Sequence, residues 1–423
     1  MGLVQTYGNI IKHYQSTHPA VSRHMITAGL FLERFRAKHL SDKRIPKAYV
    51  ELNTLAVGQI LHGLKHPETT AWTNLFTPVE ILQCFDLFCL SAEALSSFWS
   101  GFFIEDRFID DAETAGIAPT LCSYHKCFLG SALSDVMTKP SFAVTTSTVC
   151  DANFNTFRFI EKHCKIPTIF LDIPAVSTPE SRQYVVDQLK ELIRSLESHT
   201  GRSFDPDRLR EILARENRSK ELYLLYLREK AQKAYPTTLT LQMYELFATH
   251  LAIGSPEALH FFQSLYDEIR QCPDFHGKRI YWVHLLPFYH ESLRNVLNLS
   301  DTWQLQGFEM NVDFTEPLDT KDPLTALAGK LIGNIYNRPF EDKIDLVLSM
   351  AKSLRSDGLI HFCHWGCKQS VGGAMHLKKA VTEAGLPMLL LDGDAIDRRN
   401  SADGQIRTRL DAFLELLNAN GAA

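Results

Sequence analysis

Residues 358–395 have the sequence GLIHFCHWGCKQSVGGAMHLKKAVTEAGLPMLLLDGDA, which reads as a buried strand, a loop with two cysteines, a helix and a second apolar strand ending in Leu-Asp. Residues 142–175, FAVTTSTVCDANFNTFRFIEKHCKIPTIFLDIPA, run through the same order of elements. Two related α/β units that face each other would bring the carboxyl ends of their strands together at one ligand crevice. The internal similarity therefore predicts two lobes with a site between them.

The sequence around these stretches is helical at the N-terminus and in the middle. Apolar residues recur at three- and four-residue spacing in the first 65 residues, and residues 201–276 form charge-rich helical patterns, while residues 65–70 (KHPETT) read as a linker. We predict an α/β protein with two Rossmann-like, doubly wound lobes. Its predicted parts are an N-terminal helical segment (1–65), a first α/β lobe (66–200), a helical domain (201–276) and a second α/β lobe (277–423). The predicted strands are 87–93, 141–147 and 167–174 in the first lobe, and 278–286, 359–362 and the PMLLLD segment in the second.

Composition narrows the classes of function. The chain has 423 residues and a net charge of −5, so no basic surplus exists to neutralise nucleic-acid phosphates. No apolar run approaches the roughly 20 residues that cross a bilayer, and the first residues lack the layout of a signal peptide. We expect a cytoplasmic protein with neither a nucleic-acid nor a membrane partner. In that reducing compartment its nine cysteines favour metal binding, catalysis or core packing over disulfides.

Six of the nine cysteines lie close together in pairs, where chance would give roughly a third of one such pair. The pairs are Cys84/Cys89, Cys122/Cys127 and Cys363/Cys367. Grouped thiolates suit a soft metal centre, above all an iron–sulfur cluster. Because one cubane takes four cysteines, or three when one iron stays open, six ligands predict two cubanes with a bridging or exchangeable position on each.

The remaining cysteines are weaker candidates. Cys150 precedes the start of a helix and is a candidate for lining the crevice, although a structural role is the commoner fate of such a residue. Cys164 and Cys272 have no close partner and are expected in the core or on the surface. Zinc is the rival metal for Cys122 and Cys127, but structural zinc sites favour spacings of two to four between cysteines.

Basic side chains accompany two of the cysteine pairs. His125, His361, His364 and Lys368 lie near enough in sequence to donate hydrogen bonds to sulfur or to deliver protons, so we take them as candidate catalytic residues. Each one has an ordinary loop role as its alternative. The chain contains neither a GxxxxGK[ST] phosphate loop nor a GxGxxG fingerprint, so nothing recommends it as an ATPase or a dinucleotide enzyme by itself.

These segments resemble the 2-hydroxyacyl-CoA dehydratase and benzoyl-CoA reductase superfamily. The matching pieces are FTPVEILQCFDLF, LCSYHKCFLG, VCDANFNTFRFIEKHCKIPTIFLDIP and IHFCHWGCKQSVGGAMHLKKAVTEAGLPMLLLDGDAIDRR. The resemblance implies two Rossmann-like lobes with a helical domain and an iron–sulfur cluster between the lobes. It also implies low-potential electrons from a separate ATP-hydrolysing activator that carries its own 4Fe-4S cluster.

Dehydratase subunits of this superfamily contribute one cysteine from each of three segments to a single 4Fe-4S cluster, whereas here each segment has two. The chain therefore resembles the double-cubane cluster proteins, homodimeric reductases of small molecules with an 8Fe-9S centre. That resemblance makes the six paired cysteines the cluster ligands. Two alternatives stay open: an acyl-CoA dehydratase or reductase subunit with a single 4Fe-4S cluster, and an electron-transfer or metal-storage protein without catalysis.

Overall fold

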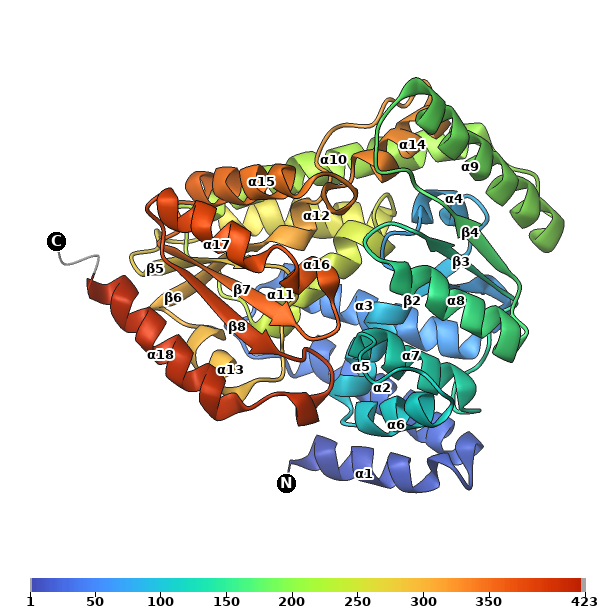
Figure 1. Cartoon of the computed structure of the whole chain (residues 1–423), viewed down its shortest axis with the longest axis horizontal. Coiled ribbons are helices and arrows are strands. Elements are labelled where there is room, and N and C mark those ends of the chain that lie inside the picture. The colour runs from blue at the N-terminus through green and yellow to red at the C-terminus, as the bar shows by residue number, and fades with distance from the viewer. Residues whose placement is uncertain (1, 420–423) are drawn as a thin grey trace.

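The computed structural model describes residues 2–419, and within them two parallel β-sheets form the centres of two lobes (Figure 1). The predicted α/β class with two lobes is confirmed. The first sheet has the order β2-β1-β3-β4, built from β1 (Thr70–Thr73), β2 (Phe88–Ser91), β3 (Phe142–Thr146) and β4 (Thr168–Leu171). The second has the order β6-β5-β7-β8, built from β5 (Lys278–Val283), β6 (Trp303–Phe308), β7 (Gly358–His364) and β8 (Met388–Gly393).

The two sheets share one strand order: second, first, third, fourth. The two similar stretches, 142–175 and 358–395, supply the third and fourth strands of their sheets, so they are equivalent units of the fold. The first strand of each sheet carries a fully buried tryptophan, Trp72 or Trp282. With this order the winding reverses between the first and third strands, and ligands of such sheets bind at the carboxyl ends there.

Two strands, β1 and β6, were not among those predicted. The segment expected as a linker (65–70) holds a 3₁₀ turn at Pro67–Thr69 and the first residue of β1. β1 has only four residues, all buried, and such a short run carries no periodicity that would distinguish it. The apolar sequence of β6 is interrupted by Gln304 and Gln306, whose buried amides lower the apolar content of the strand.

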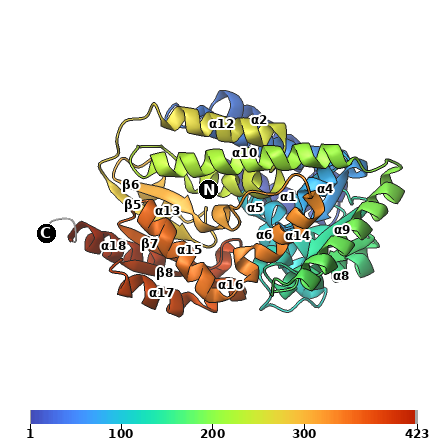
Figure 2. The ribbon, with the colours of Figure 1, turned by 90° about the horizontal axis from the view of Figure 1, so that it is seen from above.

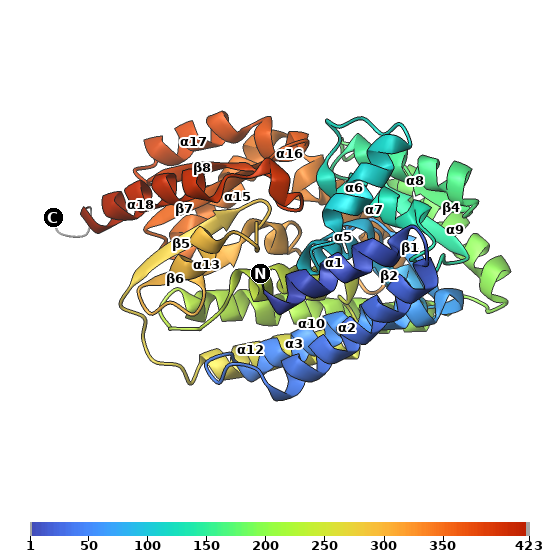
Figure 3. The same cartoon turned by 90° about the horizontal axis from the view of Figure 1, so that it is seen from below.

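Helices of the N-terminus and of the middle of the chain pack into one layer beneath both lobes (Figures 2 and 3). They are α1 (Leu3–Gln15), α2 (Pro19–His39), α3 (Lys47–Lys65), α10 (Pro206–Lys230), α11 (Leu239–Leu246), a π-helical turn (Phe247–Leu251) and α12 (Pro256–Ile269). α3 packs against both α2 and α12, which joins the two helical segments. α10 contacts a helix of the first lobe and β6 of the second, so this layer connects the lobes.

The other helices flank the sheets. In the first lobe they are α4 (Val79–Gln83), α5 (Ala92–Gly101), α6 (Glu105–Thr114), α7 (Ser123–Leu133), α8 (Asp151–Cys164) and α9 (Pro179–Thr200). In the second they are α13 (Glu291–Leu297), α15 (Phe340–Ser353), α16 (Lys368–Val371), α17 (Ala374–Glu383) and α18 (Asp403–Ala419), whereas α14 (Pro323–Gly333) packs against α9 of the first lobe. Across residues 2–419, no helix combines the length and apolar character that crossing a membrane requires.

Candidate functional site

A cavity of about 410 Å³ lies where the carboxyl ends of the two sheets face each other. Residues in the loops that follow strands of both lobes line it: Leu75 after β1, Cys150 after β3, His284 after β5 and Cys367 after β7. These are the positions at which doubly wound sheets bind ligands. The crevice predicted between the lobes is therefore present in the structure.

Three cysteines line this cavity together: Cys122, Cys150 and Cys367. Each occupies the position just before a helix, at the starts of α7, α8 and α16 respectively. The first N–H groups of a helix have no partner within the helix and point towards negative charge, so each helix start stabilises the thiolate beside it. The donating N–H groups belong to Tyr124 for Cys122, to Ala152 and Asn153 for Cys150, and to Gln369 and Ser370 for Cys367.

Burial works against ionisation of these thiols. It raises the pKa of Cys150 to about 12, and it raises the pKa values of Cys122 and Cys367 as well. The charge of Cys367 raises the pKa of each of the other two further. As thiolates the three would repel each other, so only a positive centre between them would allow all three to be deprotonated together.

The backbone around the cavity is adapted to bring the loops together. Gly366 has a φ of +80°, and a Cβ added to it would lie 2.8 Å from the backbone nitrogen of Cys122, so only glycine allows this approach of the two cysteine loops. Val149 and His284, which also border the cavity, have φ values of +82° and +68°. Such strained non-glycine residues persist where the surrounding structure holds them, often at functional sites.

Two buried histidines of the second lobe contact the cysteines. The His364 Nε2 lies 3.3 Å from the Cys122 Sγ, and the His284 Nε2 lies 3.4 Å from the Cys367 Sγ. Burial lowers the pKa values of both rings, so each is neutral at neutral pH and carries one ring proton. These histidines can therefore donate a hydrogen bond to sulfur without adding a charge.

The other predicted proton donors have different surroundings. His125 lines the cavity with its Nδ1 2.9 Å from the Thr156 hydroxyl, and burial lowers its pKa to about 4. The His361 Nε2 donates to the Ser370 carbonyl over 2.7 Å, so this ring lies behind the site. Lys368 is exposed at the edge of the cavity. The structure thus brings His125, His364 and Lys368 to the crevice and directs the His361 hydrogen bond to the backbone.

Cys127 and Cys363 lie in the same segments as Cys122 and Cys367 but outside the cavity lining. Cys127 follows Cys122 by five residues of helix, a rotation of about 140° that turns its side chain into the core. Cys363 lies in β7 beside Asp392 of β8, and the two-residue period of a strand sends it to the face opposite His364. Sequence proximity therefore does not bring these pairs together in space.

Cys84 and Cys89 lie farther back in the first lobe. The Cys84 thiol donates to the Glu80 carbonyl over 3.3 Å at the end of α4, and Cys89 is a buried residue of β2. The prediction that six cysteines bind a cluster stays a prediction, with two of the six at the cavity. Across residues 2–419 no three Cys, His, Asp or Glu side chains are arranged to hold one metal ion.

The cavity lining also includes Glu93 and His284, which the sequence analysis did not single out, and Cys150, which it expected at the crevice. Glu93, in the first turn of α5, lines the cavity; burial raises its pKa to about 7, and its Oε2 has no hydrogen-bond partner within residues 2–419. Cys150 takes a central position, and the internal similarity marks it, because it matches Cys367 in the second stretch. The sequence feature that could have identified His284 as a site residue is its position directly after a buried strand.

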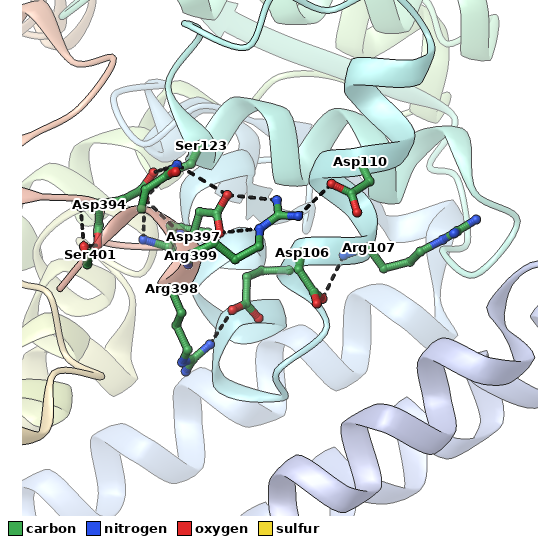
Figure 4. Close-up of polar contacts among 12 residues, drawn as sticks. Asp106, Arg107, Asp110, Ser123, Asp394, Asp397, Arg398, Arg399 and Ser401 are labelled. Atoms are coloured by element: carbon green, nitrogen blue, oxygen red, sulfur yellow. Dashed lines mark hydrogen bonds and ion pairs between the residues drawn. The ribbon is translucent and has the colours of Figure 1, made fainter. Parts of the chain in front are cut away.

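A network of polar contacts joins the loop after β8 to α6 and α7 of the first lobe (Figure 4). The Ser123 hydroxyl donates to the Asp394 carboxylate over 2.5 Å. Arg398 pairs with Glu105, and Arg399 pairs with Asp110. Since Ser123 follows Cys122 directly, this network also fixes the first lobe's cysteine loop against the second lobe.

Comparison with known proteins agrees with this architecture. The family described as 2-hydroxyglutaryl-CoA dehydratase, D-component, matches residues 74–417. The (R)-phenyllactyl-CoA dehydratase alpha subunit of Clostridium sporogenes is 22% identical over 418 residues, which cover 92% of this chain and 99% of that subunit. One of the benzoyl-CoA reductase subunits of Thauera aromatica is 23% identical over 381 residues, which cover 80% of this chain and 86% of that protein.

The family match runs from the loop after β1 into α18, so it includes every strand of the two sheets except β1, together with all three cysteines of the cavity. The relatives are named as dehydratase and reductase subunits, in agreement with the superfamily predicted from the cysteine segments. The chain belongs to the family of the 2-hydroxyglutaryl-CoA dehydratase D-component.

Proposed function

We propose that this protein is an iron–sulfur enzyme in which Cys122, Cys150 and Cys367 hold a 4Fe-4S cubane at the crevice, with one iron open to substrate. The observation that carries the proposal is the convergence of three thiols, each at the start of a helix, on one cavity between the lobes. A cubane attaches each cysteine to a different iron, so it needs thiols spread around a cavity and not gathered at one point. The N–H groups at the three helix starts also suit the negative charge of cluster sulfide.

A bound cubane would supply single electrons at low potential to a substrate in the crevice. The chain's own residues would handle the protons. Glu93 has a pKa of about 7 and an Oε2 without a hydrogen-bond partner within residues 2–419, so it can give up or accept a proton at neutral pH. His125 is neutral and faces the same cavity, and Lys368 supplies a positive charge at its edge.

The proposed substrates are acyl-CoA thioesters, in line with the names of the relatives. A groove of about 1,430 Å³ meets the cavity at Phe98 and Tyr244, which line both. Arg36, Arg294 and Arg398 line the groove among aromatic side chains. Guanidinium groups and aromatic rings suit a large anionic ligand with a planar base.

The electrons would come from a partner. The chain has no phosphate-loop motif, so ATP-dependent reduction would need a separate ATP-hydrolysing activator with its own 4Fe-4S cluster. Because the relatives are named as subunits, we also propose a second protomer, either another copy of this chain or a related subunit. We propose the cytoplasm as the cellular location of this protein. Turnover with dithionite and ATP in the absence of any activator would contradict the electron route.

The larger 8Fe-9S double cubane is a second candidate, favoured by the close pairing of six cysteines in the sequence. The amounts of iron and acid-labile sulfide per chain in anaerobically purified protein distinguish the single cubane from the double cubane. We expect about four irons per chain for a single cubane, and about eight for the double cubane. Zinc without sulfide would overturn both.

Serine variants assign the ligands. We expect Cys122→Ser, Cys150→Ser and Cys367→Ser each to lower the iron content, while Cys164→Ser, a half-buried thiol that donates to a backbone carbonyl, serves as the matched control. Retention of full iron in Cys150→Ser would refute the three-cysteine site. Loss of iron in variants of Cys84, Cys89, Cys127 and Cys363 would instead support the double cubane.

A further inference from the structure

We propose that His364 and His284 are positioning residues that donate hydrogen bonds to the sulfurs of Cys122 and Cys367 and thereby raise the reduction potential of the bound cluster. The inference rests on the proposed function, since it takes these two cysteines as cluster ligands. It concerns residues of the second lobe that act through the cysteines. Its basis is the hydrogen bonding of each ring.

For His364 the position of the ring proton follows from its neighbours. The backbone N–H of Ala395 donates to the His364 Nδ1 over 3.0 Å, so this nitrogen carries a lone pair. The ring proton is then on Nε2, which lies 3.3 Å from the Cys122 Sγ. The ring is fully buried and meets the Tyr124 ring edge-on at 5.4 Å, which limits its rotation. His364 is therefore oriented as a donor to sulfur.

The loop that supplies the Ala395 N–H is itself held in place. The Asp394 carboxylate accepts N–H bonds from Ile396 and Asp397, each over 2.9 Å, and it accepts the hydroxyl of Ser123. Figure 4 shows the Asp394 carboxylate between this turn and Ser123. Because Ser123 adjoins Cys122, one carboxylate positions both the loop that fixes the histidine tautomer and the cysteine that receives its hydrogen bond.

His284 is held by a different arrangement with the same result. Its backbone N–H donates to the Glu309 carboxylate over 3.1 Å, which supports the strained φ of +68°. The Nδ1 is buried and has no hydrogen-bond partner within residues 2–419, whereas the Nε2 lies 3.4 Å from the Cys367 Sγ. A proton on Nε2 finds an acceptor and one on Nδ1 does not, so the favoured tautomer donates to sulfur.

The two histidine N–H groups change the reduction potential of the cluster by stabilising negative charge on its sulfur atoms. Reduction adds an electron whose charge is shared by the cluster sulfurs, and an N–H aimed at a ligand sulfur stabilises that reduced state more than the oxidised one. Cys150 receives backbone N–H groups, and no histidine among residues 2–419 donates to it. Removal of one histidine should therefore lower the potential, and removal of both should lower it further.

The first test is an EPR-monitored redox titration of anaerobically reconstituted protein. We expect a more negative potential in His364→Phe and in His284→Phe, and a partial return in His364→Gln, whose amide can still donate. His290→Phe is the matched control, because His290 is equally buried in the same lobe but pairs with Asp403. Unchanged potentials in both Phe variants with full iron would overturn the inference, whereas a wild-type protein without iron would overturn the proposed function.

A second measurement works on the wild-type protein, in case a variant fails to fold. Pulsed EPR of the reduced cluster in protein labelled with ¹⁵N-histidine should show a weak nitrogen coupling, together with an exchangeable proton coupling that disappears in D₂O. Absence of both couplings would overturn the inference. A coupling as large as that of a direct iron–nitrogen bond would also overturn it, because a histidine would then be a ligand.

Discussion

Replacement of Gly366 by Ala is a direct test of how closely the cysteine loops of the two lobes approach. The new methyl group would lie 2.8 Å from the backbone nitrogen and 2.9 Å from the Cα of Cys122, and both are backbone atoms that cannot rotate away. The φ of +80° adds a second cost of about 1–2 kcal/mol for an L-residue in the left-handed region. With about 1–3 kcal/mol for overpacking, the total expected loss in free energy of unfolding is about 2–5 kcal/mol.

Gly385→Ala is the matched control for the backbone cost. Gly385 has a φ of +81°, and nothing lies within 4 Å of an added Cβ, so only the left-handed conformation is penalised. We expect a loss of about 1–2 kcal/mol there, measured by urea unfolding at equilibrium with the m-values of both variants compared. Iron content should fall in Gly366→Ala alone, since only that change moves the Cys122 loop. Equal losses of stability in the two variants, with iron unaffected in both, would refute the close approach.

Other expected outcomes concern buried charges. Burial raises the pKa of Glu93 to about 7 in the folded state, so the folded protein binds a proton that the unfolded chain has lost, and stability should fall as pH rises from about 4.5 to 7. Glu93→Gln should remove most of this fall in urea titrations across that pH range. An unchanged pH dependence in the variant would contradict the assignment. Lys330 pairs with the buried carboxylates of Glu80 and Glu216, so Lys330→Met should cost about 3–5 kcal/mol. Lys379→Met, at an exposed pair, should change stability by less than about 1 kcal/mol, and a similar loss in both lysine variants would argue against the buried cluster.

The sequence predicts the two lobes because the units in 142–175 and 358–395 each combine a buried strand, a helix start and a second strand, a pattern that only a parallel α/β sheet satisfies. It does not reveal β1, whose four buried residues carry no periodicity, although β1 is central to the first sheet. A strand of that length is recognised by its neighbours in space, which a single sequence does not show.

Pairs along the chain and the cavity of the structure select different sets of cysteines. Spacing along the sequence pairs Cys122 with Cys127 and Cys363 with Cys367. Helix rotation and strand alternation, however, separate the members of each pair in space. Comparing the two lobes gives a better criterion, because Cys150 and Cys367 each follow the third strand of a sheet and begin a helix. Glu93 and His284 depend on tertiary packing, so the sequence held little that could single them out.

The site divides its chemistry unequally between two similar lobes. The first lobe supplies two thiols, Cys122 and Cys150, and the carboxyl group of Glu93. The second supplies one thiol, and both histidines that contact cysteine sulfur belong to it. Each lobe alone would therefore offer either two thiols without the histidines that contact them or the histidines with a single thiol. The contacts that hold the lobes together, among them Ser123 with Asp394, are for this reason part of the site as well as of the fold.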